Sequence, residues 1–238
     1  MCNSINSMES EIRPGRFQVL PVVIKNLIII NALVWLAQIT VGQDLISIED
    51  LFALHHFSSM HYHAWQYFTY MFLHSSSSFF HILFNMFALW MFGSTLENLW
   101  GPGRFLAFYL VCGLGAGITQ ALALTYDLSQ YHAMFNAGQI GADELYVLIN
   151  MPTLGASGAV MGIFAAFAYT FPNSQMIILP IPFPIKAKWA LLGLAALDLF
   201  GGVYSSNSGI AHFAHLGGAA VGIVIVMIWN RKNRRHFY

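Results

Sequence analysis

Six apolar runs follow one another along the chain, separated by polar or proline-containing connections. They cover residues 24–41, 79–99, 105–126, 154–171, 189–204 and 210–229. A helix needs about 20 apolar residues to cross a bilayer core of about 30 Å, and most of these runs come close to that length. The pattern predicts an all-α membrane protein, with a six-span bundle at residues 24–230 between an amino-terminal tail at 1–23 and a basic tail at 231–238.

The composition fits a chain that lies in a lipid bilayer. Of the 238 residues, 57% are hydrophobic and only 8% are charged, whereas soluble domains carry about 25% charged residues. These charges are too few to cover a water-facing surface. The formal net charge is zero, so nothing points to the basic patch of a nucleic-acid-binding protein, and we expect no nucleic-acid partner.

The basic residues predict which way the helices run. In a six-span chain all ten fall on one side: Arg13, Arg16, Lys25, Arg104, Lys186, Lys188, Arg231, Lys232, Arg234 and Arg235. The loops of the other side carry acidic residues instead: Asp44, Glu49, Asp50, Asp127, Asp143 and Glu144. Because lysine and arginine are retained on the cytoplasmic side, we expect both termini in the cytoplasm.

The outer loop expected at residues 42–78 combines histidines with aromatic residues. Its histidines are His55, His56, His61, His63 and His74. Aromatic side chains suit the headgroup layer of a membrane, which favours an interfacial loop. Histidines can also bind zinc, but no cysteine or carboxylate is interleaved with them, so we predict no metal site.

Four polar side chains from three different runs are expected at one depth. Ser157 lies near the outer end of the fourth run, His215 near the outer end of the sixth, and His81 and Asn85 in the first turns of the second. Each is a few residues below the outer surface, at about 1.5 Å per residue. A serine and a histidine at matching depth can act as a nucleophile and its base, and Asn and His side chains can stabilise an oxyanion.

These residues also have simpler interpretations. A serine in a membrane helix can donate to a carbonyl one turn earlier, and His81 and Asn85 share a helical face that could form ordinary interhelical hydrogen bonds. His212 lies three residues before His215, and spacing alone does not decide which histidine is the base. Asp198 in the fifth run must be paired or protonated. Its estimated depth is nearer mid-membrane, so we interpret it as structural rather than as a third catalytic group.

Glycine pairs follow both the serine and the histidine. Gly158 and Gly162 lie directly after Ser157, and Gly218 and Gly222 lie after His215, each pair in the GxxxG spacing. Small residues at this spacing let two membrane helices approach closely. We therefore expect the fourth and sixth runs to meet through these glycines, which would bring the serine and the histidine together.

At these residues the chain resembles the rhomboid family of intramembrane serine proteases. Gly155-Ala-Ser157-Gly158 is similar to the family's GxSG motif, and the segment from His215 through Gly218 to Gly222 resembles its HxxGxxxG motif. His81 and Asn85 match HxxxN, and the segment from Gly93 through Glu97 to Gly101 resembles a structural GxxxExxxG motif. The resemblance selects His215 over His212 as the base. Glu97 is expected to organise the loop that follows it.

The resemblance implies a six-helix rhomboid bundle and a Ser157–His215 dyad without an acid, a metal or another cofactor. The oxyanion hole would consist of the Ser157 backbone N–H with the His81 and Asn85 side chains. The implied substrate is the transmembrane helix of a single-span protein in the lipid bilayer, and the implied location is a bacterial inner membrane. The oligomeric state stays open.

Two positions depart from the family pattern. Trp65 is followed by Gln66 rather than arginine, which puts the anchoring of the outer loop in question. Met161 stands four residues after the serine, where many members have an aromatic side chain that packs on the histidine. The alternative functions are a non-catalytic scaffold that binds transmembrane helices, as inactive rhomboid relatives do, and a small-solute transporter. The absence of an internal repeat counts against the transporter.

Overall fold

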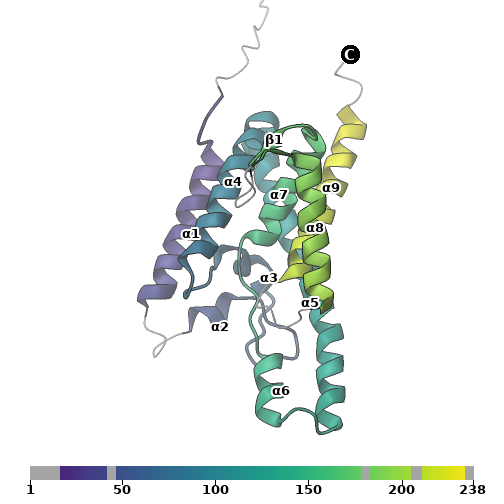
Figure 1. Ribbon diagram of the computed structural model, residues 1–238. Coiled ribbons are helices and arrows are strands. Elements are labelled where there is room, and N and C mark those ends of the chain that lie inside the picture. Colours follow the sequence, from purple (N-terminus) through teal and green to yellow (C-terminus); the bar gives the residue numbers. More distant parts are fainter. Residues whose placement is uncertain (1–16, 42–46, 178–182, 205–210, 234–238) are drawn as a thin grey trace, which may run out of the picture.

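The computed structural model describes residues 17–41, 47–177, 183–204 and 211–233 (Figure 1). Within these ranges five helices are long and apolar enough to cross a membrane: α1 (Val22–Thr40), α4 (Phe79–Trp100), α5 (Pro102–Asn136), α8 (Ala187–Tyr204) and α9 (His212–Asn233). A further apolar helix, α7 (Ser157–Thr170), is shorter. The prediction of an all-α membrane protein is confirmed, whereas the sixth crossing and the cytoplasmic position of the termini stay predictions.

Short elements occupy the connections at both ends of the bundle. The loop between α1 and α4 contains α2 (Ile48–Phe52), α3 (Gln66–Thr69) and the 3-10 helix η1 (Tyr70–Phe72), and α6 (Ala142–Ile149) lies between α5 and α7. At the opposite end β1 (Gln175–Met176) pairs antiparallel with β2 (Ile185–Lys186). The start of α1 and the end of α9 lie at this same end (Figure 1).

Helix α5 is longer than the apolar run that predicted it. The run covers residues 105–126, whereas the helix has 35 residues and continues to Asn136. At 1.5 Å per residue it is about 52 Å long, well beyond the bilayer core. Polar residues from Asp127 onwards end the apolar run without ending the helix. Figure 1 shows the far part of α5 and the returning α6 extending beyond the other helices.

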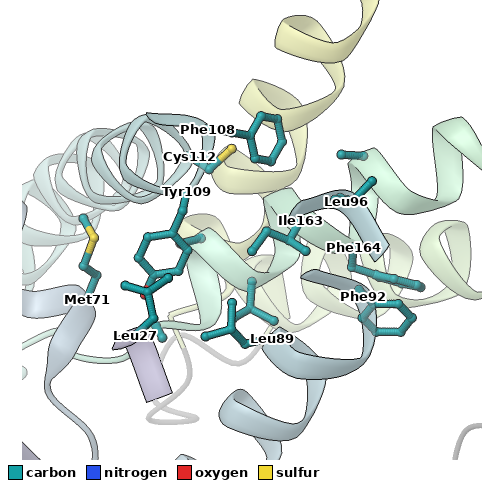
Figure 2. Packing of buried hydrophobic residues seen from close by; sticks show 14 of the residues in the cluster. Leu27, Met71, Leu89, Phe92, Leu96, Phe108, Tyr109, Cys112, Ile163 and Phe164 are labelled. Atoms are coloured by element: carbon teal, nitrogen blue, oxygen red, sulfur yellow. The ribbon is translucent and has the colours of Figure 1, made fainter. Parts of the chain in front are cut away.

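Helix α7 lies in the middle of the bundle and contacts α4, α5, α8 and α9. Nine of its 14 residues are buried, and most of these are glycine or alanine. Small side chains allow neighbouring backbones to come close, and this packing holds membrane helices together. The larger residues Ile163 and Phe164 join a buried cluster with Leu89 and Phe92 of α4 and Tyr109 of α5 (Figure 2).

Glu97 holds α1 in place. Its two carboxylate oxygens accept hydrogen bonds from the backbone N–H groups of Val23 and Ile24, both at 2.9 Å. These N–H groups belong to the first turn of α1, where a helix has no internal acceptors and where its dipole favours a negative charge. The sequence suggested that Glu97 organises the loop after it. The structure instead shows the carboxylate at the start of a helix more than 70 residues earlier.

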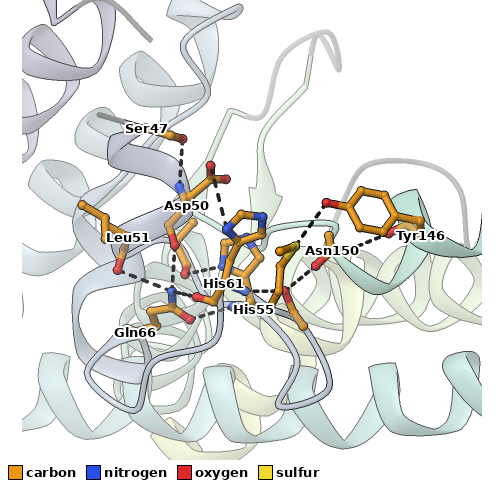
Figure 3. A network of polar contacts seen from close by, with 11 residues as sticks. Ser47, Asp50, Leu51, His55, His61, Gln66, Tyr146 and Asn150 are labelled. Carbon is orange, nitrogen blue, oxygen red and sulfur yellow. Dashed lines mark hydrogen bonds and ion pairs between the residues drawn. The ribbon is translucent and has the colours of Figure 1, made fainter. Parts of the chain in front are cut away.

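Gln66 organises the outer loop from its centre (Figure 3). Its side chain is fully buried. The amide nitrogen donates to the carbonyls of His61 at 2.7 Å and Asp50 at 3.0 Å, and the amide oxygen accepts from the backbone N–H groups of His55 and His63. The loop is therefore anchored by an uncharged residue at the position where the family pattern has arginine.

The side chains of two histidines in the outer loop contact the loop itself or α5. The His55 ring contacts the carbonyl of Ala53, and the His56 ring contacts the Thr125 hydroxyl at 3.0 Å. Burial lowers the pKa of both rings, so they are neutral at pH 7. In the part of the chain that the structure describes, His, Cys, Asp and Glu form no group of three or more that could hold a metal ion.

Some sequence predictions lie outside the described residues. They concern residues 1–16 of the amino-terminal tail with Arg13 and Arg16, Asp44 of the outer loop, the start of the sixth run at Ile210, and Arg234 and Arg235 of the basic tail. Helix α9 continues to Asn233 and so includes the first part of the segment at 231–238.

Candidate active site

Ser157 is the first residue of α7. The apolar run begins at Leu154, but the helix cannot begin there because Gly155 has φ +128°, a conformation that residues with a side chain rarely adopt. The Gly155 N–H donates to the Tyr70 carbonyl at 3.0 Å, and Leu54 and Thr153 exchange two backbone hydrogen bonds of 2.8 Å. The outer loop thus holds the segment that leads into Ser157.

His215 contacts Ser157 from the first turn of α9. Its Nε2 lies 2.8 Å from the Ser157 hydroxyl oxygen. The same turn is held by Gln120 of α5, whose side-chain oxygen accepts a hydrogen bond from the buried Ala214 N–H at 3.2 Å. The same N–H also donates to the Ala211 carbonyl at 3.0 Å, so Gln120 adds a contact between α5 and the first turn of α9. The hydroxyl contact belongs to His215, the histidine that the motif selected over His212.

The glycine pairs lie at the contact between α7 and α9. A side chain on Gly218 would overlap the Gly158 carbonyl, and the Cβ of any residue at Gly222 would lie 2.5 Å from the Gly162 carbonyl oxygen. The two backbones therefore touch where the GxxxG spacing placed them. Ser157 and His215 lie within one turn of these contacts, and close backbone approach brings their side chains within hydrogen-bond distance.

His81 presents an N–H to the Ser157 hydroxyl region. The Ser75 backbone N–H donates to His81 Nδ1 at 3.2 Å, so in the neutral ring the proton lies on Nε2. A Cβ at Gly155 would be 3.1 Å from His81 Nε2 and 3.6 Å from Ser157 Oγ. The imidazole N–H and the serine hydroxyl thus flank the same short stretch of backbone, which has space for them because residue 155 is glycine.

Asn85 lies one turn further along α4. It is buried, and its side-chain nitrogen donates to the His81 carbonyl at 2.9 Å. This bond uses one of the two amide N–H groups. A cavity of about 800 Å³ is lined by Ser157, His215, His81 and Asn85, together with Met161. All four side chains that the sequence placed in one layer therefore border one cavity, and the methionine at the departing position borders it too.

Asp198 lies closer to this site than its place in the sequence suggested. Its Oδ1 is 3.0 Å from His215 Nδ1 and 2.8 Å from His212 Nδ1. Counted from the ends of their helices, Asp198 is about 9 Å below Tyr204 and His215 about 4.5 Å below the start of α9. Two side chains span the difference of about 4.5 Å. The backbone of Asp198 does lie deeper than that of His215, but the reach of the two side chains brings the carboxylate into contact with the histidines.

His74 lies behind His81. Its side chain is fully buried, and the two rings meet edge to face with centroids 5.2 Å apart. Burial, and then repulsion from His81, lowers the pKa of His74 to about 3. Gln38 of α1 holds the backbone here, because it accepts from the His74 N–H and donates to the His74 carbonyl. The sequence showed no sign of this role.

The residues of this site fall within a known protein domain. A family model described as the Rhomboid domain matches residues 61–232, which include Ser157, His215, His81 and Asn85. The chain belongs to the rhomboid family.

Individual relatives are similar to the chain over about two thirds of its length. The rhomboid protease AarA of Providencia stuartii is 32% identical over 164 residues, which are 68% of this chain and 54% of that protein. The mitochondrial presenilin-associated rhomboid-like protein of Homo sapiens is 33% identical over 166 residues, 67% of this chain and 38% of that protein. The mitochondrial rhomboid protein 1 of Saccharomyces cerevisiae is 29% identical over 150 residues, 63% of this chain and 38% of that protein. The chain therefore spans about half or less of the length of these relatives.

Proposed function

We propose that the chain is a serine endopeptidase that hydrolyses peptide bonds within or next to transmembrane segments of other membrane proteins. The observation that carries this proposal is the 2.8 Å contact between His215 Nε2 and Ser157 Oγ beside a cavity. Membership of the rhomboid family, and a relative that is named a rhomboid protease, support the same reaction.

In the proposed reaction His215 Nε2 takes the proton of Ser157 Oγ while this oxygen attacks the scissile carbonyl carbon. The carbonyl oxygen becomes an oxyanion, which the Ser157 backbone N–H and the side chains of His81 and Asn85 stabilise. His215 then gives its proton to the leaving amine, and an acyl group remains on Ser157. A water molecule that loses its proton to His215 attacks the acyl group, and the serine is released.

The substrate that we propose is the transmembrane helix of a single-span protein. Phe80 and Phe84 of α4 line the cavity and are largely exposed, so an apolar segment that arrives from the bilayer would meet apolar surface. Carbonyls in a helix are hydrogen-bonded, and the substrate must unwind locally before one of them can be attacked. Glycine or proline near the cleaved bond should therefore favour cleavage.

We also propose that residues 24–230 form the protease domain and cross the bilayer six times, with both termini in the cytoplasm. The absence of basic residues from one side of this arrangement supports the orientation. The relatives include a protein of Providencia stuartii and several proteins that are named mitochondrial, so they do not single out a bacterial inner membrane.

The test is cleavage of a single-span substrate by the purified full chain in detergent, together with labelling by a fluorophosphonate probe that reacts with activated serines. Ser157→Ala should abolish both signals without lowering Tm, because it removes a single oxygen atom. His215→Ala should abolish both signals as well, but Tm should fall, because the change also removes a ring that pairs with the buried Asp198. His212→Ala should keep most of the activity. Probe labelling that survives in Ser157→Ala, or an unlabelled wild-type protein that still binds the substrate helix, would point to a scaffold instead of a protease.

A further inference from the structure

Helix α8 is largely exposed but carries one buried acidic residue. Only Ala187, Ala190 and Asp198 of this helix are buried. A carboxylate inside a membrane is expensive unless it is well paired. Asp198 is paired through Oδ1, which lies 3.0 Å from His215 Nδ1 and 2.8 Å from His212 Nδ1.

The surface of α8 next to this carboxylate is shaped to receive the first turn of α9. Gly201 and Gly202 lie three and four residues after Asp198 and so share its side of the helix. A Cβ at Gly201 would lie 2.5 Å from the His212 ring, and a Cβ at Gly202 would lie 2.8 Å from the Phe213 ring. The two glycines therefore let α9 come close enough for the carboxylate to reach both histidines.

The bond to Asp198 decides which nitrogen of His215 carries the proton. A carboxylate only accepts hydrogen bonds, so His215 must present Nδ1–H to it. The neutral ring then has a lone pair on Nε2, the nitrogen that faces the Ser157 hydroxyl at 2.8 Å. This is the tautomer that a general base needs. When Nε2 takes the serine proton, the carboxylate stays ionised and faces the positively charged ring.

We propose that Asp198 is a positioning residue for His215, so that this chain operates with a serine, a histidine and an acid from three different helices. This inference rests on the proposed protease function. Asp198 contacts neither the substrate nor the reacting oxygen. It holds the ring orientation and the tautomer of the base, while His212 shares the same oxygen and keeps the carboxylate in place. Among the described residues, His212 on α9 and His81 on α4 are also titratable groups near His215, and Glu49 and Asp127 line the same cavity.

The test compares Asp198→Asn with the matched control Asp143→Asn on the exposed surface of α6. Asparagine keeps the size of the side chain but can turn an N–H toward His215 and thereby favour the wrong tautomer. We expect kcat to fall by about 10²-fold or more, because the same change in a soluble serine protease lowers kcat by about 10⁴. KM and Tm should stay close to wild type. The control Asp143→Asn should match wild type in kcat, KM and Tm.

One further measurement separates positioning from a structural role. The ¹⁵N spectrum of histidine-labelled wild-type protein at pH 8, assigned with His215→Ala, should show His215 protonated on Nδ1. This spectrum requires no folded Asp198 variant.

Protonation on Nε2, or a kcat within twofold of wild type in Asp198→Asn, would overturn the inference. So would a loss of activity that merely follows a loss of Tm. These outcomes differ from failure of the proposed function. If Ser157→Ala remains active, the protease proposal falls. If Ser157 and His215 are required and Asp198→Asn behaves as wild type, only the role of Asp198 falls.

Discussion

Gly218 of α9 lies directly against the backbone carbonyl of Gly158 in α7, with no space for even a methyl group between them. A backbone carbonyl cannot rotate away as a side chain can. The two helices are therefore at their closest possible distance at this point, one residue from Ser157 and three from His215. This contact sets the distance between the serine and the histidine.

Gly218→Ala should separate α7 from α9 and misplace the reacting groups. A displacement of about 1 Å can lower a rate by about 10²-fold, so we expect a loss of at least this size in kcat, together with a lower Tm. Gly193→Ala is the matched control, because Gly193 of α8 has no neighbour within 4 Å of the added Cβ. Full activity in Gly218→Ala would mean that α9 can shift without moving His215.

Gln66→Leu should weaken the outer loop. The change leaves the part-buried His61 carbonyl and the buried His55 N–H without the partner that Gln66 provides, and a buried group left in this way costs about 1–3 kcal/mol. We expect the free energy of unfolding to fall by at least about 2 kcal/mol. Activity should fall as well, because this loop holds the segment before Ser157. Gln139→Leu, at an exposed position after α5, should change neither quantity.

His81→Ala and Asn85→Ala should each lower kcat without abolishing activity. Loss of one oxyanion donor costs about 10²–10³ in rate, and the remaining donors soften the effect. Exposed residues of the same types at α5, His132 and Asn136, provide matched alanine controls. The measurement is kcat for one single-span substrate in one detergent. Wild-type rates in both variants would show that this surface of α4 serves packing alone.

His74→Phe should reduce the sensitivity of the protein to acid. The folded protein keeps His74 neutral down to a pKa of about 3, whereas the unfolded chain protonates it near its ordinary value of 6.5. Below pH 6.5 the unfolded state therefore binds more protons, and stability falls as the pH is lowered. Between pH 7.5 and pH 5 the variant should lose about 2 kcal/mol less stability than wild type.

Thermal unfolding at several pH values checks this prediction. The matched control is His132→Phe on the exposed surface of α5, which should keep the wild-type dependence. Glu49 contacts the Gln38 side chain, and His81 faces the His74 ring, so both of these neighbours must be retained in all variants. Equal acid sensitivity of His74→Phe and wild type would contradict a neutral buried ring.

Most of the candidate site could be predicted because its residues carry local signals. Ser157, His215, His81 and Asn85 are polar residues in apolar runs, and each lies a countable number of residues from the end of its run. Depth in a membrane is nearly proportional to this count, at about 1.5 Å per residue. The spacing of the glycines also predicted which surfaces of the two helices meet. These quantities follow from helix geometry and need no knowledge of the rest of the fold.

The partners of Glu97, Gln66 and Asp198 could not be predicted in this way. Glu97 binds a helix more than 70 residues away, Gln66 replaces an arginine with an amide network, and Asp198 reaches two histidines across helices. Each contact depends on how far a side chain extends from its backbone and on which neighbour lies opposite. The length of α5 could not be predicted either, because the polar residues from Asp127 onwards end the apolar run while the helix continues to Asn136.

The sequence by itself determined that this is a helical membrane protein, which residues lie at a common depth, and where two helices can touch, because bilayer thickness and helix periodicity act on each segment separately. Only the tertiary structure decided that Asp198 contacts His215 and His212, that α7 begins at Ser157, and that Gln66 anchors the outer loop. These features depend on distances between side chains of different helices, and such distances arise only when all the helices have packed together.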